Sequence, residues 1–541
     1  MRSRRLHLSL LFFLSLAILS PGIGSISIFT DPDEYHRIYR TVLSMIETDE
    51  WMAPRLDGIP RVRKPPLTYW ITRASFELFG VSATSGRAIN VFFGALFVVV
   101  VALIGFEYDK DPAYGFSAAL IALSMLGMGI SSKFLMHDLS VAALSGLAFY
   151  CFLAWRRTQR RVFLPAMAAA LTAGYFIKGP MALVVTGSAI VSLMSTKPDV
   201  RAFLWQSKLV LLLSAVLSLS LILAWYGYVS SLYPDQSFAQ MDRELSARHL
   251  GTLTLRPLAA VFWMFLPWTI VFFGALYRLR PTEELSTGGA KTSLVIFFGL
   301  SLLPFFFFHF LDRYILGSVI PVALLCALSF KSADAGKLGL ECRLGMAIAS
   351  TIALLWVGAS WWFRTSTWES SLVLLACLFF VIVWLRRPTV IPMALSASLV
   401  WLALTGFLLP TFGSNRIPPR IVELVKASRV ILYRVPEPAF LPMILGRSLE
   451  FKEKLRPPDG LNLRQQPAWI FVNRRDKKRF EQNASAVGVA PRLVDSYSSF
   501  PSMDGFTSQS REKTIAGNMT RAFRARSLEP IMDTFLLYRS E

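Results

Sequence analysis

A carboxylate and an ammonium group stand out in residues 30–70, a polar stretch that lies between two long apolar runs. Asp33 follows a proline and precedes Glu34, and a carboxylate in such a place can act as a general base on a hydroxyl group. Lys64 precedes two prolines that stiffen the backbone, so its charge suits a phosphate group. Both patterns also fit structural roles. The two acids suit the start of a helix, and the lysine suits a base that reaches the membrane surface.

Further residues that could take part in chemistry lie near the ends of later apolar runs: Asp138 after a histidine, Lys178 before Gly-Pro, Arg248, His249 and Arg256 in one polar stretch, and Arg313 and Tyr314 after an aspartate. His249 could bind a metal ion, and the arginines could bind phosphate. The structural alternatives are a helix cap at 138, a turn at 178, a solvated helix face over 244–256 and a local ion pair at 312–313.

Membrane spans are the elements that must position these residues. The 541 residues are 54% hydrophobic and 17% charged, against about 25% charged in soluble domains. After an N-terminal apolar run at 6–28, runs long enough to cross a bilayer recur near 86–107, 113–130, 134–154, 162–177, 179–195, 207–230, 258–277, 292–309, 312–330, 343–362, 369–386 and 390–411. The sequence therefore predicts a polytopic α-helical membrane protein with about thirteen transmembrane helices.

The loop charges predict the orientation of these spans. Lys- and Arg-rich short loops alternate with loops poor in base, and the positive-inside rule then places the N-terminus in the cytoplasm. This rule and anionic lipids explain the net charge of +21 better than nucleic acid does. We read the first run as an uncleaved signal anchor rather than a removed signal peptide. All the candidate residues then fall at the outer face, where ionisable groups at membrane depth suggest function.

The chain divides into two predicted domains. Residues 1–411 form the transmembrane domain, with outer loops at 29–85 and 231–257. In the first loop, 33–48 and 67–79 have the pattern of interfacial helices. Residues 412–541 are more polar, and strand-like and helical runs alternate there, so we expect an extracytoplasmic α/β domain. The four cysteines lie in or beside spans, which argues against a disulfide framework. No Walker, HExxH or GxSxG motif supports a nucleotide-binding or hydrolase function.

Several motifs together resemble those of the integral-membrane GT-C glycosyltransferases. PDE at 32–34, WMAPRLDG at 51–58 and KPPLTYW at 64–70 carry the resemblance. It is strongest to the 4-amino-4-deoxy-L-arabinose lipid A transferases and their protein mannosyltransferase relatives. The Asp138 segment, IKGP at 177–180, LPW at 266–268, DRYIL at 312–316 and PEPAFLPMILGR at 436–447 keep the family's order.

The resemblance implies an inverting transferase whose donor is a sugar on a polyprenyl phosphate. The leaving lipid phosphate is a stable anion, so cationic stabilisation matters more than a general acid. By resemblance, Asp33 is the main catalytic carboxylate and Asp138 a second acidic site residue. The donor phosphate would be held by Lys64, helped by Arg313 and by Arg248 or Arg256. The other expected substrate-binding residues are Glu34, Tyr35, Tyr69, Lys178 and Tyr314.

One departure from the family pattern bears on metal binding and on the sugar. The aminoarabinose branch has a glutamate linked to a bound metal before the KPP lysine, whereas this chain has Arg63. A divalent metal, with His249 as its candidate ligand, is therefore left open. So is the choice between an aminopentose and a hexose as the transferred sugar.

The expected partners are membrane lipids, the lipid-linked sugar donor and a glycolipid, glycan or protein acceptor. We expect no nucleic acid partner and a monomeric protein in a bacterial inner membrane, with a periplasmic active site. The alternative is a transporter or flippase for a lipid-linked sugar. That function predicts charges near the bilayer midplane and repeated, broken spans. Here the charges collect at one predicted face, and the sequence shows no internal repeat.

Overall fold

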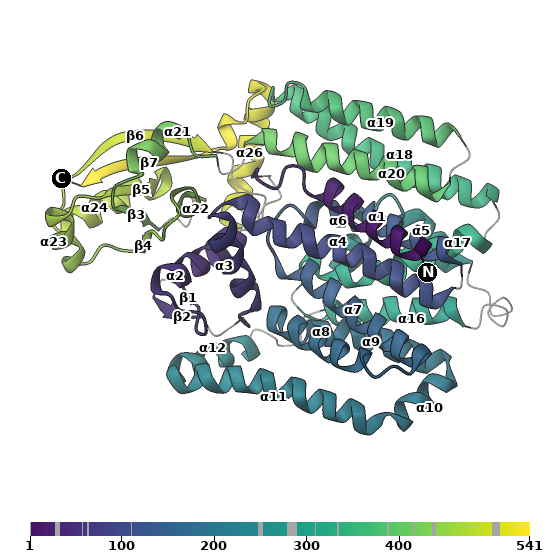
Figure 1. The fold of residues 1–541 in the computed structure, drawn as a ribbon. Helices are drawn as coiled ribbons and strands as arrows, with labels where there is room; N and C mark the ends of the chain where they lie inside the picture. Colours follow the sequence, from purple (N-terminus) through teal and green to yellow (C-terminus); the bar gives the residue numbers. More distant parts are fainter. Residues whose placement is uncertain are drawn as a thin grey trace.

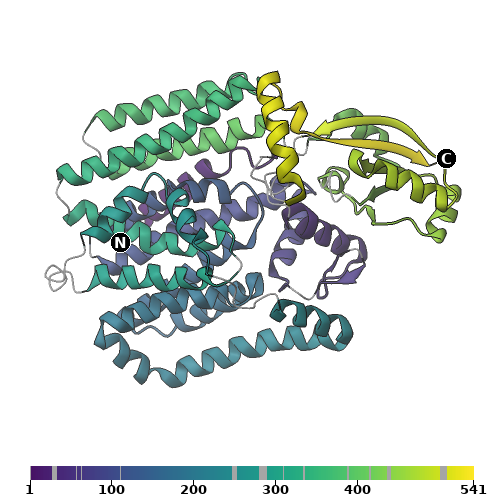
Figure 2. The ribbon, with the colours of Figure 1, turned by 180° about the vertical axis from the view of Figure 1, so that it is seen from behind.

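A bundle of helices carries a five-stranded sheet at one end (Figure 1, Figure 2). The structure is a computed structural model. It describes residues 2–26, 33–56, 58–61, 64–109, 111–246, 253–278, 289–308, 310–332, 335–386, 389–413, 416–434, 440–499 and 509–540. Both views place the first outer loop, helix α12 (Pro234–Ser246) and the sheet at the same end of the bundle.

The bundle is built from the apolar runs, and each predicted run contains at least one helix. Its helices are α1 (Arg2–Leu19), α4 (Ala83–Tyr108), α5 (Pro112–Leu123), α6 (Leu126–Ser131), α7 (His137–Thr158), α8 (Phe163–Lys178), α9 (Met181–Thr196), α10 (Pro198–Gln206), α11 (Lys208–Leu232), α13 (Arg256–Met264), α14 (Thr269–Tyr277), α16 (Ala290–Leu302), α17 (Val319–Ser332), α18 (Ala335–Trp362), α19 (Glu369–Leu385) and α20 (Val390–Leu402). The short helices η3 (Asp312–Ser318) and η4 (Ala403–Leu408) extend two of them.

The number of spans differs from the predicted count. Within the described residues, six helices are long and apolar enough to cross a membrane, or up to eight if each of two bent pairs is one span. The pairs α9–α10 and α13–α14 bend by 119° and 114°. Pro198 stands at the first position of α10, and Pro267 lies in the break between α13 and α14. Proline can start a new helix but cannot continue an old one. Four more apolar helices are shorter. Thirteen spans therefore stay a prediction.

Ion pairs gather the loops that the sequence places on the inner side. Arg157 Nε lies 2.6 Å from Glu107 Oε2, and Lys331 Nζ lies 2.7 Å from Asp109 Oδ2. Arg156 pairs with Asp199. These contacts join four segments of the chain, near residues 107–109, 156–157, 199 and 331. Because α7 runs from His137 to Thr158, the residues of the Asp138 segment lie at the other end of that helix.

The first outer loop folds into short elements on top of the bundle. These are the π-helix η1 (Glu34–Tyr39), α2 (Arg40–Thr48), the hairpin β1 (Arg55–Leu56) and β2 (Ile59–Pro60), and α3 (Leu67–Phe79). Both predicted helices of the loop are confirmed. The apolar residues of the first one form its buried face, which includes Tyr35, Ile38, Val42 and Met45. The hairpin between them was not predicted, since its strands have only two residues each.

The C-terminal unit is an α/β structure around a mixed sheet. Its strands are β3 (Val430–Tyr433), β4 (Glu450–Lys452), β5 (Trp469–Asn473), β6 (Pro491–Ser499) and β7 (Asp533–Ser540), in the order β4-β3-β5-β7-β6. Its helices are α21 (Pro419–Val425), α22 (Leu441–Leu445), α23 (Pro457–Gln465), α24 (Lys477–Ala486) and α26 (Gln509–Ala525). Strands are confirmed at the four runs where the sequence predicts them: Val430–Tyr433, Trp469–Val472, Leu493–Tyr497 and Phe535–Tyr538. The division into domains at residue 412 stays a prediction.

Helices cover both faces of this sheet, because alternate strand residues point to opposite sides. Val430 and Leu432 pack with α21 and α22, whereas Ile431 and Tyr433 pack with α23 and α24. Helix α26 returns to the bundle, where the Phe523 and Trp362 rings stack with centroids 4.6 Å apart. The four cysteines of the chain are buried and free, as predicted.

Candidate active site

Three helices bring Asp138, Lys178, Arg313 and Tyr314 together at the outer end of the bundle. The Lys178 ammonium group and Arg313 Nε donate to different oxygens of Asp138, the latter over 3.0 Å. The three charged side chains are only 5%, 12% and 13% exposed. Lys178 Nζ also lies 3.5 Å from the centre of the Tyr314 ring. The structure therefore unites four of the predicted site residues in one charged cluster, the Asp138 cluster.

These contacts differ from those that the structural alternatives predict for the same residues. The Asp138 carboxylate is engaged by side chains from other helices instead of serving as a simple cap. Lys178 is a half-buried ligand of that carboxylate and not an exposed base in a turn. Arg313 Nε donates to Asp138, while Oδ2 of its neighbour Asp312 accepts a hydrogen bond from Trp263 Nε1 over 3.0 Å.

The turn after Lys178 aims its side chain at the cluster. Gly179 ends α8 with φ +67°, a conformation that residues with a Cβ atom rarely adopt. Proline at the next position then starts the following helix. The Gly-Pro pair thus reverses the chain directly behind the lysine.

The KPP segment of the first outer loop lies against the Asp138 cluster. Thr68 Oγ1 is 2.7 Å from His137 Nδ1, the residue before Asp138. Lys64 and Arg61 are near enough to interact electrostatically with His137, and Lys64 also with Lys178. Two cations bind the Asp138 carboxylate, and two more, Lys64 and Arg61, interact with its neighbour His137. This excess of positive charge suits a phosphate group.

Asp33 stands at the start of η1 and is accessible. Its carboxylate is 38% exposed and forms an ion pair with Arg37 NH1, one helical turn on, over 2.8 Å. Among the described residues, the Asp33 side chain makes no capping hydrogen bond to the helix. Asp33 therefore stands at the start of a helix, as the structural alternative predicts, but its carboxylate pairs with Arg37 instead of capping a backbone amide.

Glu34 points the other way, into the protein. It is fully buried and accepts hydrogen bonds from Arg87 Nε and NH2 (2.7 and 2.9 Å), the Tyr39 hydroxyl (2.7 Å) and the Leu135 amide (2.7 Å). The Arg87 NH1 group donates to the Ile23 carbonyl over 2.9 Å. The expectation that Glu34 binds substrate is therefore corrected: protein donors already surround its carboxylate.

The remaining predicted site residues lie outside the Asp138 cluster. Tyr35 and Tyr69 are fully buried, the second beneath Arg61 Nε, which donates to its hydroxyl over 2.7 Å. They belong to the packed core of the loop. Arg256 is exposed at the start of α13 and interacts electrostatically with Asp312.

Some of the residues that bear on metal binding are not described by the structure. Arg63, Arg248 and His249 lie outside the described ranges. Within those ranges, no three His, Cys, Asp or Glu residues come close enough together to hold a metal ion.

Sequence reasoning missed Arg87, Arg61 and Thr68. Arg87 had a usable signal, because an arginine at the start of an otherwise apolar span is expensive unless it has a partner. Thr68 lies inside the KPPLTYW motif, but only the fold shows that it meets His137.

His36 gives the first outer loop a dependence on pH. Burial, then the nearby Arg40 and Arg37, lower the pKa of His36 to about 3. The folded protein therefore keeps this imidazole neutral, while the unfolded chain takes up a proton below its ordinary pKa of about 6.5. Stability from this residue is present above that value and is lost as the pH falls towards 3.

We expect His36→Phe, which keeps a ring beside Tyr35, to lose less thermal stability between pH 7 and pH 4 than the wild type. Equal losses would contradict this.

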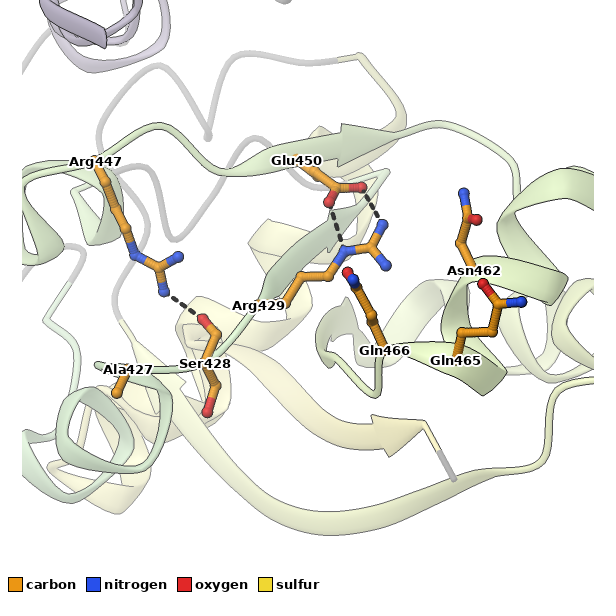
Figure 3. A pocket seen from close by; sticks show the side chains of 8 residues that line it. All are labelled: Ala427, Ser428, Arg429, Arg447, Glu450, Asn462, Gln465 and Gln466. Atoms are coloured by element: carbon orange, nitrogen blue, oxygen red, sulfur yellow. Dashed lines mark hydrogen bonds and ion pairs between the residues drawn. The ribbon is translucent and has the colours of Figure 1, made fainter.

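A second polar cavity lies within the C-terminal unit (Figure 3). It measures about 500 Å³ and is lined by Ala427, Ser428, Arg429, Arg447, Glu450, Asn462, Gln465 and Gln466. Arg429 is held by Glu450 through hydrogen bonds of 2.6 and 2.9 Å, and Arg447 donates to backbone carbonyls after α21. Both cations are thus engaged in holding the unit together, and none of the predicted site residues is among the lining residues.

Parts of the chain match known glycosyltransferases. Residues 30–236 match the family model of dolichyl-phosphate-mannose-protein mannosyltransferases. An undecaprenyl phosphate-α-4-amino-4-deoxy-L-arabinose arabinosyl transferase of Sodalis glossinidius is 27% identical over 58% of this chain and 57% of that protein. Another, from Yersinia enterocolitica, is 25% identical over 65% of each. The matched regions thus span less than two thirds of these relatives.

The fold matches over more of the chain. ArnT from Cupriavidus metallidurans bound to undecaprenyl phosphate superposes with a TM-score of 0.70, at 17% identity, over 90% of this chain and 96% of ArnT. Its apo form gives 0.62, at 18% identity, over 90% and 94%. The predicted resemblance is thereby confirmed: in sequence and in fold, this chain resembles the GT-C glycosyltransferases and, among them, the 4-amino-4-deoxy-L-arabinose transferases.

Proposed function

We propose that the protein is an inverting glycosyltransferase that moves a sugar from a polyprenyl phosphate to an acceptor. The observation that carries the proposal is the excess of positive charge around Asp138, next to the KPP segment and at the same end of the bundle as the loop that bears Asp33. The relatives' names and the undecaprenyl phosphate bound to ArnT agree with a lipid phosphate as the leaving group.

In this mechanism the cations hold the phosphate and Asp33 takes the proton. Lys64, Lys178 and Arg313 stabilise the negative charge that grows on the phosphate as it leaves. An acceptor hydroxyl attacks the anomeric carbon and gives its proton to Asp33. The bond from that carbon to the phosphate oxygen breaks, and the oxygen keeps the electron pair. Asp138 orients Lys178 and Arg313 by accepting a hydrogen bond from each.

Glu34 has a positioning role in this proposal. Its ion pair with Arg87 fixes the first residue of η1, and Asp33 precedes that residue directly. The acceptor is a glycolipid such as lipid A, another glycan or a protein, and the sugar is an aminopentose or a hexose. A metal ion has no part in the proposed steps.

The proposed location is the periplasmic side of a bacterial inner membrane. Support comes from the two ends of the bundle: the basic loops meet at one end, and the polar outer segments and the C-terminal unit stand at the other. With the basic loops in the cytoplasm, as the positive-inside rule requires, residues 412–541 form a periplasmic domain.

The direct test uses the purified protein in proteoliposomes. Undecaprenyl phosphate carrying a radiolabelled sugar is supplied together with lipid A, and the products are separated by thin-layer chromatography. We expect label to move to lipid A and undecaprenyl phosphate to appear. Movement of intact donor across the membrane without transfer would contradict the proposal and support a flippase.

Lys64 provides a prediction for donor binding. We expect Lys64→Ala to weaken binding of undecaprenyl phosphate by about tenfold to a hundredfold, because a charge-assisted hydrogen bond contributes about 1.5–3 kcal/mol. Binding is measured by displacement of a fluorescent polyprenyl phosphate. The matched control is Lys208→Ala at the start of α11, next to α10 and at the end of the bundle opposite to α12 (Figure 1). Equal affinity of Lys64→Ala and wild type would remove Lys64 from the phosphate site.

A further inference from the structure

The C-terminal unit touches the first outer loop through Phe440. This residue immediately precedes α22 and is 2% exposed. Its ring centroid lies 4.8 Å from that of Tyr35, and the Arg87 guanidinium lies over the ring at 5.6 Å from its centre. Such a distance and placement are those of a cation–π contact. Phe440 thus contacts Tyr35 of η1 and also Arg87, the ion-pair partner of Glu34.

These contacts lie directly after the proposed base in the sequence. Tyr35 is two positions after Asp33, and Arg87 holds Glu34, the residue between them. The first two residues of η1 are therefore held, one directly and one through Arg87, by a single side chain from a distant part of the sequence. A displacement of that side chain would move the start of η1 and the carboxylate on it.

The same packing reaches the other half of the site. Phe440 shares one buried cluster with Phe134, Leu135 and Met136, which lead directly into His137 and Asp138. Leu135 also donates its amide proton to Glu34. The C-terminal residue therefore sits where the Asp33 segment and the Asp138 segment meet.

Two polar contacts fix the orientation of the C-terminal unit on the loop. The Ser448 amide donates to Glu47 Oε1 over 2.6 Å, and the Arg40 guanidinium lies 5.6 Å from the centre of the Phe451 ring. Both loop residues lie on α2, which continues η1 without a break. The interface thus extends along the loop and is not a single touching point.

We propose that Phe440 is a positioning residue for Asp33, through which the C-terminal unit holds the catalytic loop in its working geometry. The inference rests on the proposed function. Phe440 has no contact with the reacting groups in this scheme and acts through Tyr35 and Arg87. Since a misplacement of about 1 Å can cost about a hundredfold in rate, such a residue affects turnover more than binding.

The first test is kinetic and uses the full-length protein. We expect Phe440→Ala to lower kcat by about tenfold or more, while the KM for the lipid-linked donor stays within about twofold. Phe440→Leu, which retains most of the packing volume, restores much of kcat. The matched control is Phe480→Ala: this phenylalanine is also fully buried in the C-terminal unit, but it packs against Tyr433 on the other face of the sheet. We expect the control to lower thermal stability and leave kcat unchanged.

The second test does not depend on activity. Hydrogen–deuterium exchange followed by mass spectrometry reports on the amides of Glu34–Tyr39. We expect faster exchange there in Phe440→Ala and wild-type exchange there in Phe480→Ala. Unchanged kcat and exchange in Phe440→Ala would overturn the inference and leave the proposed function standing. Absence of transfer by the wild type would overturn the proposed function, and the exchange result would still decide whether Phe440 orders the loop.

Discussion

Asp33→Asn is expected to lower the rate of sugar transfer by about a hundredfold to ten-thousandfold, the usual contribution of a general base. The amide keeps the size of the side chain but cannot accept the acceptor's proton. The side chain is partly exposed and forms an ion pair with Arg37, an exposed arginine one turn away, so folding should be little affected. Initial rates of transfer, with thermal unfolding measured on the same preparations, check both parts.

The matched control for this prediction is Asp49→Asn. Asp49 is another carboxylate of the first outer loop, is 86% exposed and also pairs with an arginine, Arg73. We expect it to keep nearly the wild-type rate. An Asp33→Asn variant that is as active as the control would show that the base is elsewhere.

The largest expected effect on stability follows from removal of Arg87 alone. Arg87→Met leaves the fully buried Glu34 carboxylate without its cation, and breaking a buried pair in this way costs about 3–5 kcal/mol. Thermal unfolding in detergent should show a large fall in Tm. The double variant Glu34→Gln with Arg87→Met removes both charges and should be more stable than Arg87→Met alone.

The coupling energy between the substitutions of Glu34 and Arg87 tests whether the two residues form an ion pair. Contacting residues give non-additive changes in a double-mutant cycle. Changes in unfolding free energy that simply add would contradict the internal ion pair. As a comparison, Arg420 with Asp495 forms an exposed pair in the C-terminal unit, and we expect its removal to change stability by about 1 kcal/mol or less.

Much of the fold follows from patterns that are local in sequence. Apolar runs predict the bundle helices, and the amphipathic spacing of Tyr35, Ile38 and Val42 predicts the face that the first loop buries. Alternating strand and helix runs predict the α/β character of the C-terminal unit. Strand β4 escaped prediction because its three residues are all half-buried and carry two charges. The number of spans is harder to predict from sequence. A bend near a proline decides whether one apolar run crosses the membrane or forms two shorter helices.

The chemistry of the candidate site depends on contacts that no local pattern contains. From sequence, Arg313 has its nearest acid next to it, yet it binds Asp138, 175 positions earlier. Asp33 and Glu34 look equivalent as neighbours, but the helix that starts there turns one outward and the other inward. Motif resemblance found the members of the Asp138 cluster because it carries information about tertiary contacts indirectly. It could not distinguish a residue at the substrate from one that supports it.

The contact between Ser448 and Glu47 can form only late in biosynthesis. The two residues are 401 positions apart, and a ribosome that adds about 5–20 residues per second needs about 20–80 seconds to make the intervening chain. During that time the loop with Asp33 has been made, but the segment that contacts it has not. The loop therefore cannot form these contacts until residues 440–451 have been synthesised, and a shorter nascent chain lacks them.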